Sequence, residues 1–313
     1  MLTPKIKTAL RYCPDLPTPP AIAMQIVELA RNPEVDLSVL VELLSNDPAL
    51  AGRLMRASNS CLFARRRKSE SLRQAIVVIG LNATMTLALS FSLSHTLKRG
   101  GDSARVIGQS WRRVLIASCA ARLIGARLRR TDSEELALAA LLQDIGILAL
   151  QAAIPSEYKP LLERAADHDD LIRLERENLQ TDHGEAGAWL MAHWKLADKL
   201  VKVPARVHGV EGGAEEEHAD FYTIVEVAGK LADLVMGDDI DRLTISMMRA
   251  AGQHADLDQA FMDGVLDELG DKLPDMAALY DTDIISAELL VGIIDQARQV
   301  VTDNLADITQ YAT

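Results

Sequence analysis

The sequence TDSEELALAALLQDIGILALQAAIP, residues 131–155, contains an apolar run about as long as a bilayer crossing. Within this run, Leu136–Ile154 is interrupted by three polar side chains and a glycine, at Gln143, Asp144, Gly146 and Gln151. A charged side chain in the middle of a membrane is costly, so we interpret the run as a core helix that contains Asp144. Thr131-x-x-Glu134 matches a capping box and predicts where this helix begins.

Composition is typical of a globular, cytoplasmic protein. The 313 residues are 49% apolar, which can fill one large helical core or two smaller ones. The net charge of -12 argues against general attraction to nucleic acid or anionic lipid. The cysteines Cys13, Cys61 and Cys119 lack metal-ligand spacing, so we expect reduced thiols. The N-terminus lacks the features of a secretory signal, and we therefore expect a cytoplasmic location.

Apolar residues recur at helical spacing along the chain, whereas alternating strand patterns are almost absent, so the sequence predicts an all-α fold. We expect an N-terminal helical bundle at residues 1–103, a second helical domain at 104–239 and a helical extension at 240–313. The Gly-containing loop Lys98–Asp102 sets the first boundary. In the extension, the apolar face of Ile284–Gln310 needs a cover. We expect its first half to pack on the second domain and its end to be free for dimerisation or output.

Short polar residues mark several helix starts. Asp36, Asp47 and Ser71 are each expected to cap a helix, and Gly80 is expected to end the helix that Ser71 begins. A further helix is expected over Ala21–Arg31 in this N-terminal part. Later helices are predicted at Asn82–Leu97, Ala104–Arg129, Ser156–Asp167, Asp170–Asn178, Asp182–Trp194, Ala197–His208 and His218–Met236.

An ordered set of short motifs carries a family resemblance over roughly residues 14 to 236. These are Leu16-Pro17-x-x-Pro20, Ser45-Asn46-Asp47-Pro48-Ala49-Leu50, Ala57-Ser58-Asn59-Ser60, Ala75-Ile76-x-x-Ile79-Gly80, Trp111, Leu141-Leu142-Gln143-Asp144-Ile145-Gly146 and Thr181-Asp182-His183-Gly184-Glu185-x-Gly187. In this order they resemble an HDOD domain, which is far more specific than any one motif. The resemblance implies a helical bundle packed on a degenerate domain folded like the His-Asp phosphohydrolases.

The resemblance also implies a function, which is regulation and not catalysis. HDOD domains are associated with bacterial signal transduction, including motility, biofilm formation and control linked to cyclic dinucleotides such as cyclic di-GMP. We therefore expect a non-catalytic protein that binds a signalling partner, such as a protein with a diguanylate cyclase or phosphodiesterase domain. A homodimer through the C-terminal helix is a further expectation, and no cofactor is expected.

The resemblance implies degenerate metal-site positions. Arg113 stands where the family pattern has its first histidine, and an arginine offers no lone pair to a metal. Gln143 replaces the histidine of the His-Asp pair and leaves Asp144, while Gly229 stands at the place of the closing aspartate. His183 and His208 match later histidines. These three possible ligands, left among the lost positions, do not make a hydrolytic centre, so no metal is expected.

Two alternatives to partner binding stay open. One is a residual metal-dependent phosphohydrolase. The other is a sensor for a nucleotide or small anion, either at Arg65, Arg66, Arg67 and Lys68 or in the pocket around Arg113, although the basic run is more typical of a solvated loop. His183 and His208 are interpreted as hydrogen-bonded core histidines before they are interpreted as ligands.

Helical phase points Arg113 and Asp144 inward, and the implied fold brings their helices together. Because an isolated buried carboxylate is costly, we expect a salt bridge between the two side chains, with His183 as a further candidate member. The alternative is that Arg113 reaches solvent while Asp144 accepts hydrogen bonds from backbone amides.

Overall fold

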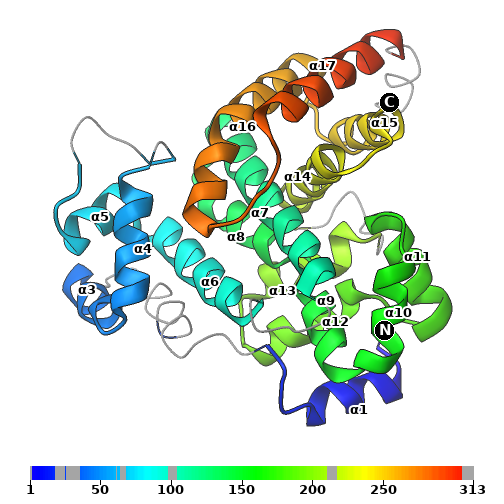
Figure 1. Ribbon diagram of the computed structural model, residues 1–313, viewed down its shortest axis with the longest axis horizontal. Helices are drawn as coiled ribbons and strands as arrows, with labels where there is room; N and C mark the ends of the chain where they lie inside the picture. The colour runs from blue at the N-terminus through cyan, green and yellow to red at the C-terminus, as the bar shows by residue number, and fades with distance from the viewer. Residues whose placement is uncertain are drawn as a thin grey trace. The chain divides into compact units, whose positions relative to one another are not determined.

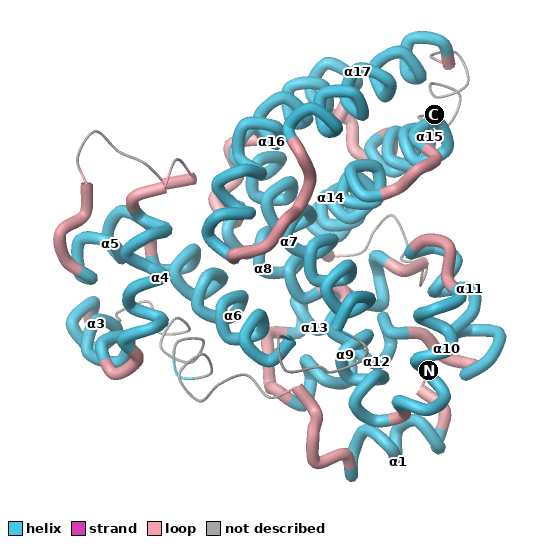
Figure 2. Tube along the Cα trace, viewed as in Figure 1, coloured by secondary structure: helices cyan, strands magenta, loops and turns pink. Residues whose placement is uncertain are grey.

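The structure is a computed structural model that describes residues 2–17, 25, 36–60, 62, 63, 68–97, 104–209 and 217–304. All regular secondary structure in these residues is helical, and Figure 2 shows helices connected by loops. The predicted all-α class is therefore confirmed. The helix predicted over Ala21–Arg31 lies outside the described residues except for Gln25.

The chain divides into two compact units (Figure 1), one of residues 1–17, 102–270 and 285–313 and one of residues 18–101 and 271–284. The larger unit includes α1 (Pro4–Tyr12), because Ile6 and Leu10 are buried and the helix packs against α9 (Ile145–Ala153). The division at 1–103, 104–239 and 240–313 stays a prediction.

The smaller unit contains α3 (Leu37–Ser45), α4 (Pro48–Ser58), α5 (Leu72–Ile79) and α6 (Leu81–Leu97). The last turns of α16 (Gln259–Tyr280) also belong to it, because the Tyr280 ring packs on Phe91 with ring centroids 5.1 Å apart and its hydroxyl hydrogen-bonds Ser90. Apolar side chains fill its core, among them Leu40, Leu44, Leu54 and Ile76.

The predicted helix ends in the smaller unit are confirmed. Asp36 Oδ1 accepts from Ser38 N at 2.8 Å, Asp47 Oδ1 from Leu50 N at 3.0 Å and Ser71 Oγ from Gln74 N at 3.2 Å. Gly80 ends α5 with a φ of 87°, a left-handed conformation that glycine adopts without steric cost.

In the larger unit, α7 (Ala104–Arg127) packs along both α8 (Ser133–Leu142) and α14 (Ala219–Met236). A second group is formed where α12 (His183–His193) packs on α9 and on α13 (Asp198–Val207). The unit also contains α10 (Pro155–Arg164), α11 (His168–Leu179), α15 (Ile240–Ala251) and α17 (Ala287–Asp303).

The stretch that was expected to form one core helix forms two. A break at Gln143 and Asp144 separates α8 from α9, so the prediction of a continuous helix is wrong. The stretch Ser133–Ala153 passes a test for a membrane span by length and composition, but its most apolar window is 78% buried inside the protein, as a core segment would be.

The predicted capping box at Thr131 is also wrong. The helix begins at Ser133, with Asp132 before it. Asp132, at the N-cap position, makes no side-chain cap hydrogen bond and binds Arg130, and the Glu134 carboxylate accepts from Arg122.

The predicted packing of the C-terminal helix on the domain at 104–239 holds in part. Helix α17 contacts α14 of that stretch, but it packs more extensively on α15, which lies in the expected extension at 240–313. Burial extends along the helix from Leu290 to Val300 and Val301, so the packed part is longer than the expected first half. Residues 305–313 of the expected free end lie outside the described residues.

Two motif glycines let α9 and α12 touch. A Cβ atom on Gly146 would lie 1.8 Å from the His183 carbonyl oxygen and 2.6 Å from Gly187 N, which real contacts do not allow. Glycine at position 146 therefore brings the start of α9, and Asp144 with it, against the start of α12.

We predict that Asp47→Ala lowers the free energy of unfolding by about 1 kcal/mol, because the amide of Leu50 loses its partner. Urea denaturation measures the change. The matched control is Glu42→Ala, which removes an exposed carboxylate from α3 without touching a cap. Equal stability of the two variants would contradict the assignment.

We predict that Gly146→Ala lowers the free energy of unfolding by about 3 kcal/mol, because the new methyl group forces α9 away from α12. The control is Gly292→Ala in α17, where nothing lies within 4 Å of the added Cβ and the higher helix propensity of alanine is expected to be neutral or stabilising. The prediction is wrong if Gly146→Ala has the same midpoint of urea denaturation as the wild type.

Candidate functional site

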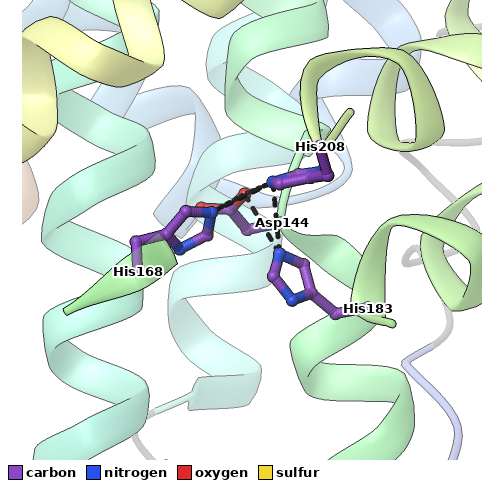
Figure 3. Close-up of side chains that lie close together, drawn as sticks. All are labelled: Asp144, His168, His183 and His208. Carbon is purple, nitrogen blue, oxygen red and sulfur yellow. Dashed lines mark hydrogen bonds and ion pairs between the residues drawn. The ribbon is translucent and has the colours of Figure 1, made fainter. Parts of the chain in front are cut away.

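Four side chains from separate helix ends converge inside the larger unit (Figure 3). Asp144 lies at the break between α8 and α9, His168 and His183 are the first residues of α11 and α12, and His208 directly follows α13. In two cases a capping aspartate sets the helix start. Asp167 accepts from Asp170 N at 2.8 Å, and Asp182 accepts from Glu185 N at 2.9 Å.

The donor atoms of this cluster face one another. His208 Nε2 lies 3.2 Å from Asp144 Oδ1, 3.0 Å from His168 Nε2 and 3.2 Å from His183 Nε2. Both His168 Nε2 and His183 Nε2 lie 3.8 Å from Asp144 Oδ1. The four side chains are at most 8% exposed. We call Asp144, His168, His183 and His208 the His-Asp cluster.

Two of the histidines are oriented by acceptors behind them. His183 Nδ1 lies 2.8 Å from Oε2 of the fully buried Glu175, which also accepts from His183 N at 2.9 Å and from the Tyr158 hydroxyl. His208 Nδ1 donates to the Pro204 carbonyl oxygen. With the proton on Nδ1, the neutral form of each ring presents a lone pair on Nε2 to the cluster.

Asp144 Oδ1 is buried without a hydrogen-bond partner among the described residues. A neutral His208 cannot satisfy it, because its single ring proton is on the Nδ1 side. The Nε2 lone pair of a neutral His208 and Asp144 Oδ1 therefore face each other at the centre of the cluster, 3.2 Å apart.

This arrangement fits a divalent metal ion with nitrogen and oxygen ligands. Metal–ligand bonds of about 2.0 to 2.1 Å in a tetrahedron place the donor atoms about 3.3 Å apart, and the separations from His208 Nε2 are 3.0 to 3.2 Å. A carboxylate or carbonyl behind each ligating histidine is the usual supporting contact. Asp144, His183 and His208 lie together in this cluster, and His168 adds a fourth donor that was not predicted.

Arg113 binds the other side of Asp144. Its Nη1 donates to Asp144 Oδ2 at 2.6 Å, which confirms the predicted salt bridge. The same guanidinium donates to Asp233 through Nε at 2.7 Å and Nη2 at 3.1 Å. All three side chains are at most 11% exposed. We call Arg113, Asp144 and Asp233 the ion triad.

The charges of the triad stabilise one another. Burial would lower the pKa of the Arg113 guanidinium, but the two carboxylates raise it above its usual value. Burial would raise the pKa of Asp144, but Arg113 and the cluster histidines hold it well below its usual range. Both groups are therefore charged at neutral pH.

The cluster histidines differ in charge preference. Burial lowers the pKa of His168 well below its usual value, and Arg113 lowers it further. Burial and the neighbouring His183 also lower the pKa of His208. Burial disfavours the charged form of His183 as well, but Glu175 outweighs it and raises the pKa of this histidine.

Gln143 and Gly229 adjoin the triad. The Gln143 amide donates to the Ala140 carbonyl oxygen at 2.9 Å. A Cβ on Gly229 would lie 2.8 Å from Gln143 Oε1 and 3.2 Å from Arg113 Nη2, so these two side chains fill the space beside this glycine. Of the proposed anion-binding run, Arg65, Arg66 and Arg67 lie outside the described residues, and Lys68 is exposed.

Three residues of the site were not predicted: His168, Glu175 and Asp233. Asp233 lies one helical turn after Gly229 on α14, so the helical period already placed a carboxylate on that face. His168 falls between the helices expected at Ser156–Asp167 and Asp170–Asn178. Reading Asp167 as a cap would have placed this histidine at a helix start. No simple sequence signal pointed to Glu175.

A cavity of about 190 Å³ adjoins the site. Arg113, His168 and Asp233 line it together with Asp167 and Asp169. Of the four cluster side chains, His168 alone reaches this cavity. Each of these three carboxylates is ion-paired, Asp167 with Arg242, Asp169 with Lys230 and Asp233 with Arg113. The Arg113 guanidinium is therefore already paired, which weakens the sensor alternative at this residue.

The HDOD domain profile matches residues 16–210, well over half of the chain, and the chain therefore belongs to the HDOD family. A relative from Treponema pallidum (strain Nichols), described as an uncharacterized protein, is 25% identical over 242 residues. That match covers 75% of this chain but only 46% of the relative, so this chain spans less than half of that protein's length.

Solved structures share the fold. An HDOD domain protein of unknown function from Geobacter sulfurreducens has a TM-score of 0.69 at 21% identity, covering 88% of this chain and 96% of its own. A candidate metal-dependent phosphohydrolase from Shewanella amazonensis SB2B scores 0.58 at 19% identity, covering 88% and 97%. A candidate signal transduction protein from Marinobacter aquaeolei VT8 scores 0.63 at 19% identity, covering 92% and 65%.

We predict that Arg113→Ala lowers the free energy of unfolding of the metal-free protein by about 3 to 5 kcal/mol, because two buried carboxylates lose their counter-ion. Replacing all three triad residues with apolar ones is expected to cost much less. Urea denaturation in the presence of a chelator measures both. Arg112→Ala, in the adjacent position, is the control, and an equal loss in the two arginine variants would contradict the triad.

Proposed function

We propose that this chain is a regulatory module of bacterial signal transduction that acts by binding a partner protein and does not hydrolyse phosphoesters. The observation that carries the proposal is the contact of Arg113 with both Asp144 and Asp233. Membership of the HDOD family and the fold shared with a candidate signal transduction protein support the regulatory part.

The charges around Asp144 disfavour phosphoester hydrolysis at this site. Metal-dependent phosphoester hydrolysis needs a metal-bound water and cations placed to stabilise the developing charge. Arg113 has no lone pair for a metal, and it occupies Asp144 Oδ2 and both oxygens of Asp233. A second ion beside Asp144 would have to displace a buried guanidinium from two carboxylates, which is strongly unfavourable.

The proposed partner is a cytoplasmic signalling protein that carries a diguanylate cyclase or phosphodiesterase domain. A candidate contact surface lies on α17, where Leu289 and Val291 are 60% and 57% exposed at the two edges of the buried stripe that contains Leu290 and Ile294. Large exposed apolar side chains on one helix are a common feature of interaction sites. Dimerisation through the same helix is the competing use of this surface.

A residual phosphohydrolase is the second candidate, and the His-Asp cluster favours it because its donor set fits a metal. The two candidate functions differ in whether the protein cleaves a phosphoester. Purified protein loaded with Mn²⁺, Fe²⁺ or Zn²⁺ is expected to leave cyclic di-GMP and bis(p-nitrophenyl) phosphate uncleaved. Cleavage that Asp144→Ala abolishes and His193→Ala retains would overturn the non-catalytic proposal.

Capture of partners from the native cytoplasm tests the binding part, with mass spectrometry to identify what is retained. We expect a signalling protein of the stated class to be retained by the wild type and by Val77→Ser, which alters an exposed residue of α5, but not by Leu289→Ser/Val291→Ser. Retention of no such protein, or equal retention by all three, would refute the proposal. Light scattering of the same variants shows whether α17 mediates dimerisation instead.

A further inference from the structure

We propose that each chain binds one divalent transition-metal ion through the His-Asp cluster, with Arg113 standing in for a second cation. The four ligand atoms are Asp144 Oδ1 and the Nε2 atoms of His168, His183 and His208. Binding of this ion is independent of the identity of a partner protein. The proposed function neither requires nor excludes it.

The donor types select the class of ion. Three imidazoles and one carboxylate suit zinc and the neighbouring first-row metals, whereas magnesium and calcium prefer oxygen ligands. Four protein ligands at mutual separations within 4.8 Å fill a tetrahedral site. Catalytic zinc sites usually keep one position open for water, so this set is typical of a binding site that stabilises structure.

The surroundings hold the ligands ready. Glu175 and the Pro204 carbonyl keep His183 and His208 in the orientation in which Nε2 faces the cluster. Such supporting contacts raise metal affinity because they fix the ring and its tautomer before binding. The buried oxygen Asp144 Oδ1, which has no hydrogen-bond partner, would gain one through coordination. A buried acceptor left without a partner is otherwise costly.

The ion triad limits the number of ions to one. The two oxygens of Asp144 have separate tasks, since Oδ1 faces the histidines and Oδ2 binds Arg113. Asp233, the other carboxylate beside this aspartate, is held by the same guanidinium at both oxygens. A second ion would find no uncommitted carboxylate there.

The cavity borders the cluster at one ligand. Of the four ligands, His168 alone lines it, and Asp167 and Asp169 in its wall form ion pairs with Arg242 and Lys230. Because His168 lies beside this cavity and begins α11, its replacement removes a ligand from the edge of the cluster while the fully buried His183 stays in place.

The test uses full-length protein without an affinity tag, stripped with a chelator and dialysed against Zn²⁺. We expect mass spectrometry of metals to give one ion per chain, with a higher melting temperature after loading. His168→Ala is expected to lower affinity at least 100-fold, and Glu175→Gln by about 10 to 100-fold. The control is His193→Ala, which removes an exposed histidine from the same helix as His183.

Several outcomes would overturn the proposal. They are fewer than one ion per two chains after loading, two ions per chain, or equal losses in His168→Ala and His193→Ala. If His168→Ala does not fold by circular dichroism, His168→Gln gives the same comparison with a smaller change in shape. The electronic spectrum of a Co²⁺-loaded sample then reports tetrahedral coordination, and a six-coordinate spectrum would contradict the four-ligand set.

Discussion

A buried guanidinium shared by two carboxylates is the interaction on which the site depends. Arg113 extends from α7 and binds Asp144 at the start of α9 and Asp233 on α14. Removing Arg113 would leave two buried carboxylates without a counter-ion, so the guanidinium holds the three elements in one arrangement. That arrangement also turns Asp144 Oδ1 toward the three histidines. The ion triad and the His-Asp cluster therefore share one carboxylate, with one oxygen for each.

Local signals made much of the fold predictable. Caps at Asp36, Asp47 and Ser71 and the stop at Gly80 depend on neighbouring residues only, and these predictions held. The break at Gln143–Asp144 was not predictable from periodicity, because apolar residues continue on both sides of it. Beside the break, Gly146 approaches the start of α12 closely, a contact with residues far along the chain that periodicity does not encode.

The site was also predictable only in part, because some of its residues meet through contacts between distant parts of the chain. Inward helical phase together with the fold that the family resemblance implies paired Arg113 with Asp144, and the family pattern singled out His183 and His208. His168 and Glu175 act through tertiary contacts that no spacing encodes. The losses at Arg113, Gln143 and Gly229 indicated a dead hydrolase site, whereas the structure retains a donor set on the far side of Asp144.

The most direct test of this account is a crystal structure of zinc-loaded protein with anomalous data collected at the zinc edge. The account predicts one anomalous peak among Asp144, His168, His183 and His208, with Arg113 still hydrogen-bonded to Asp144 and Asp233. Two peaks beside Asp144, or an Arg113 side chain displaced from both carboxylates by an ion, would contradict it.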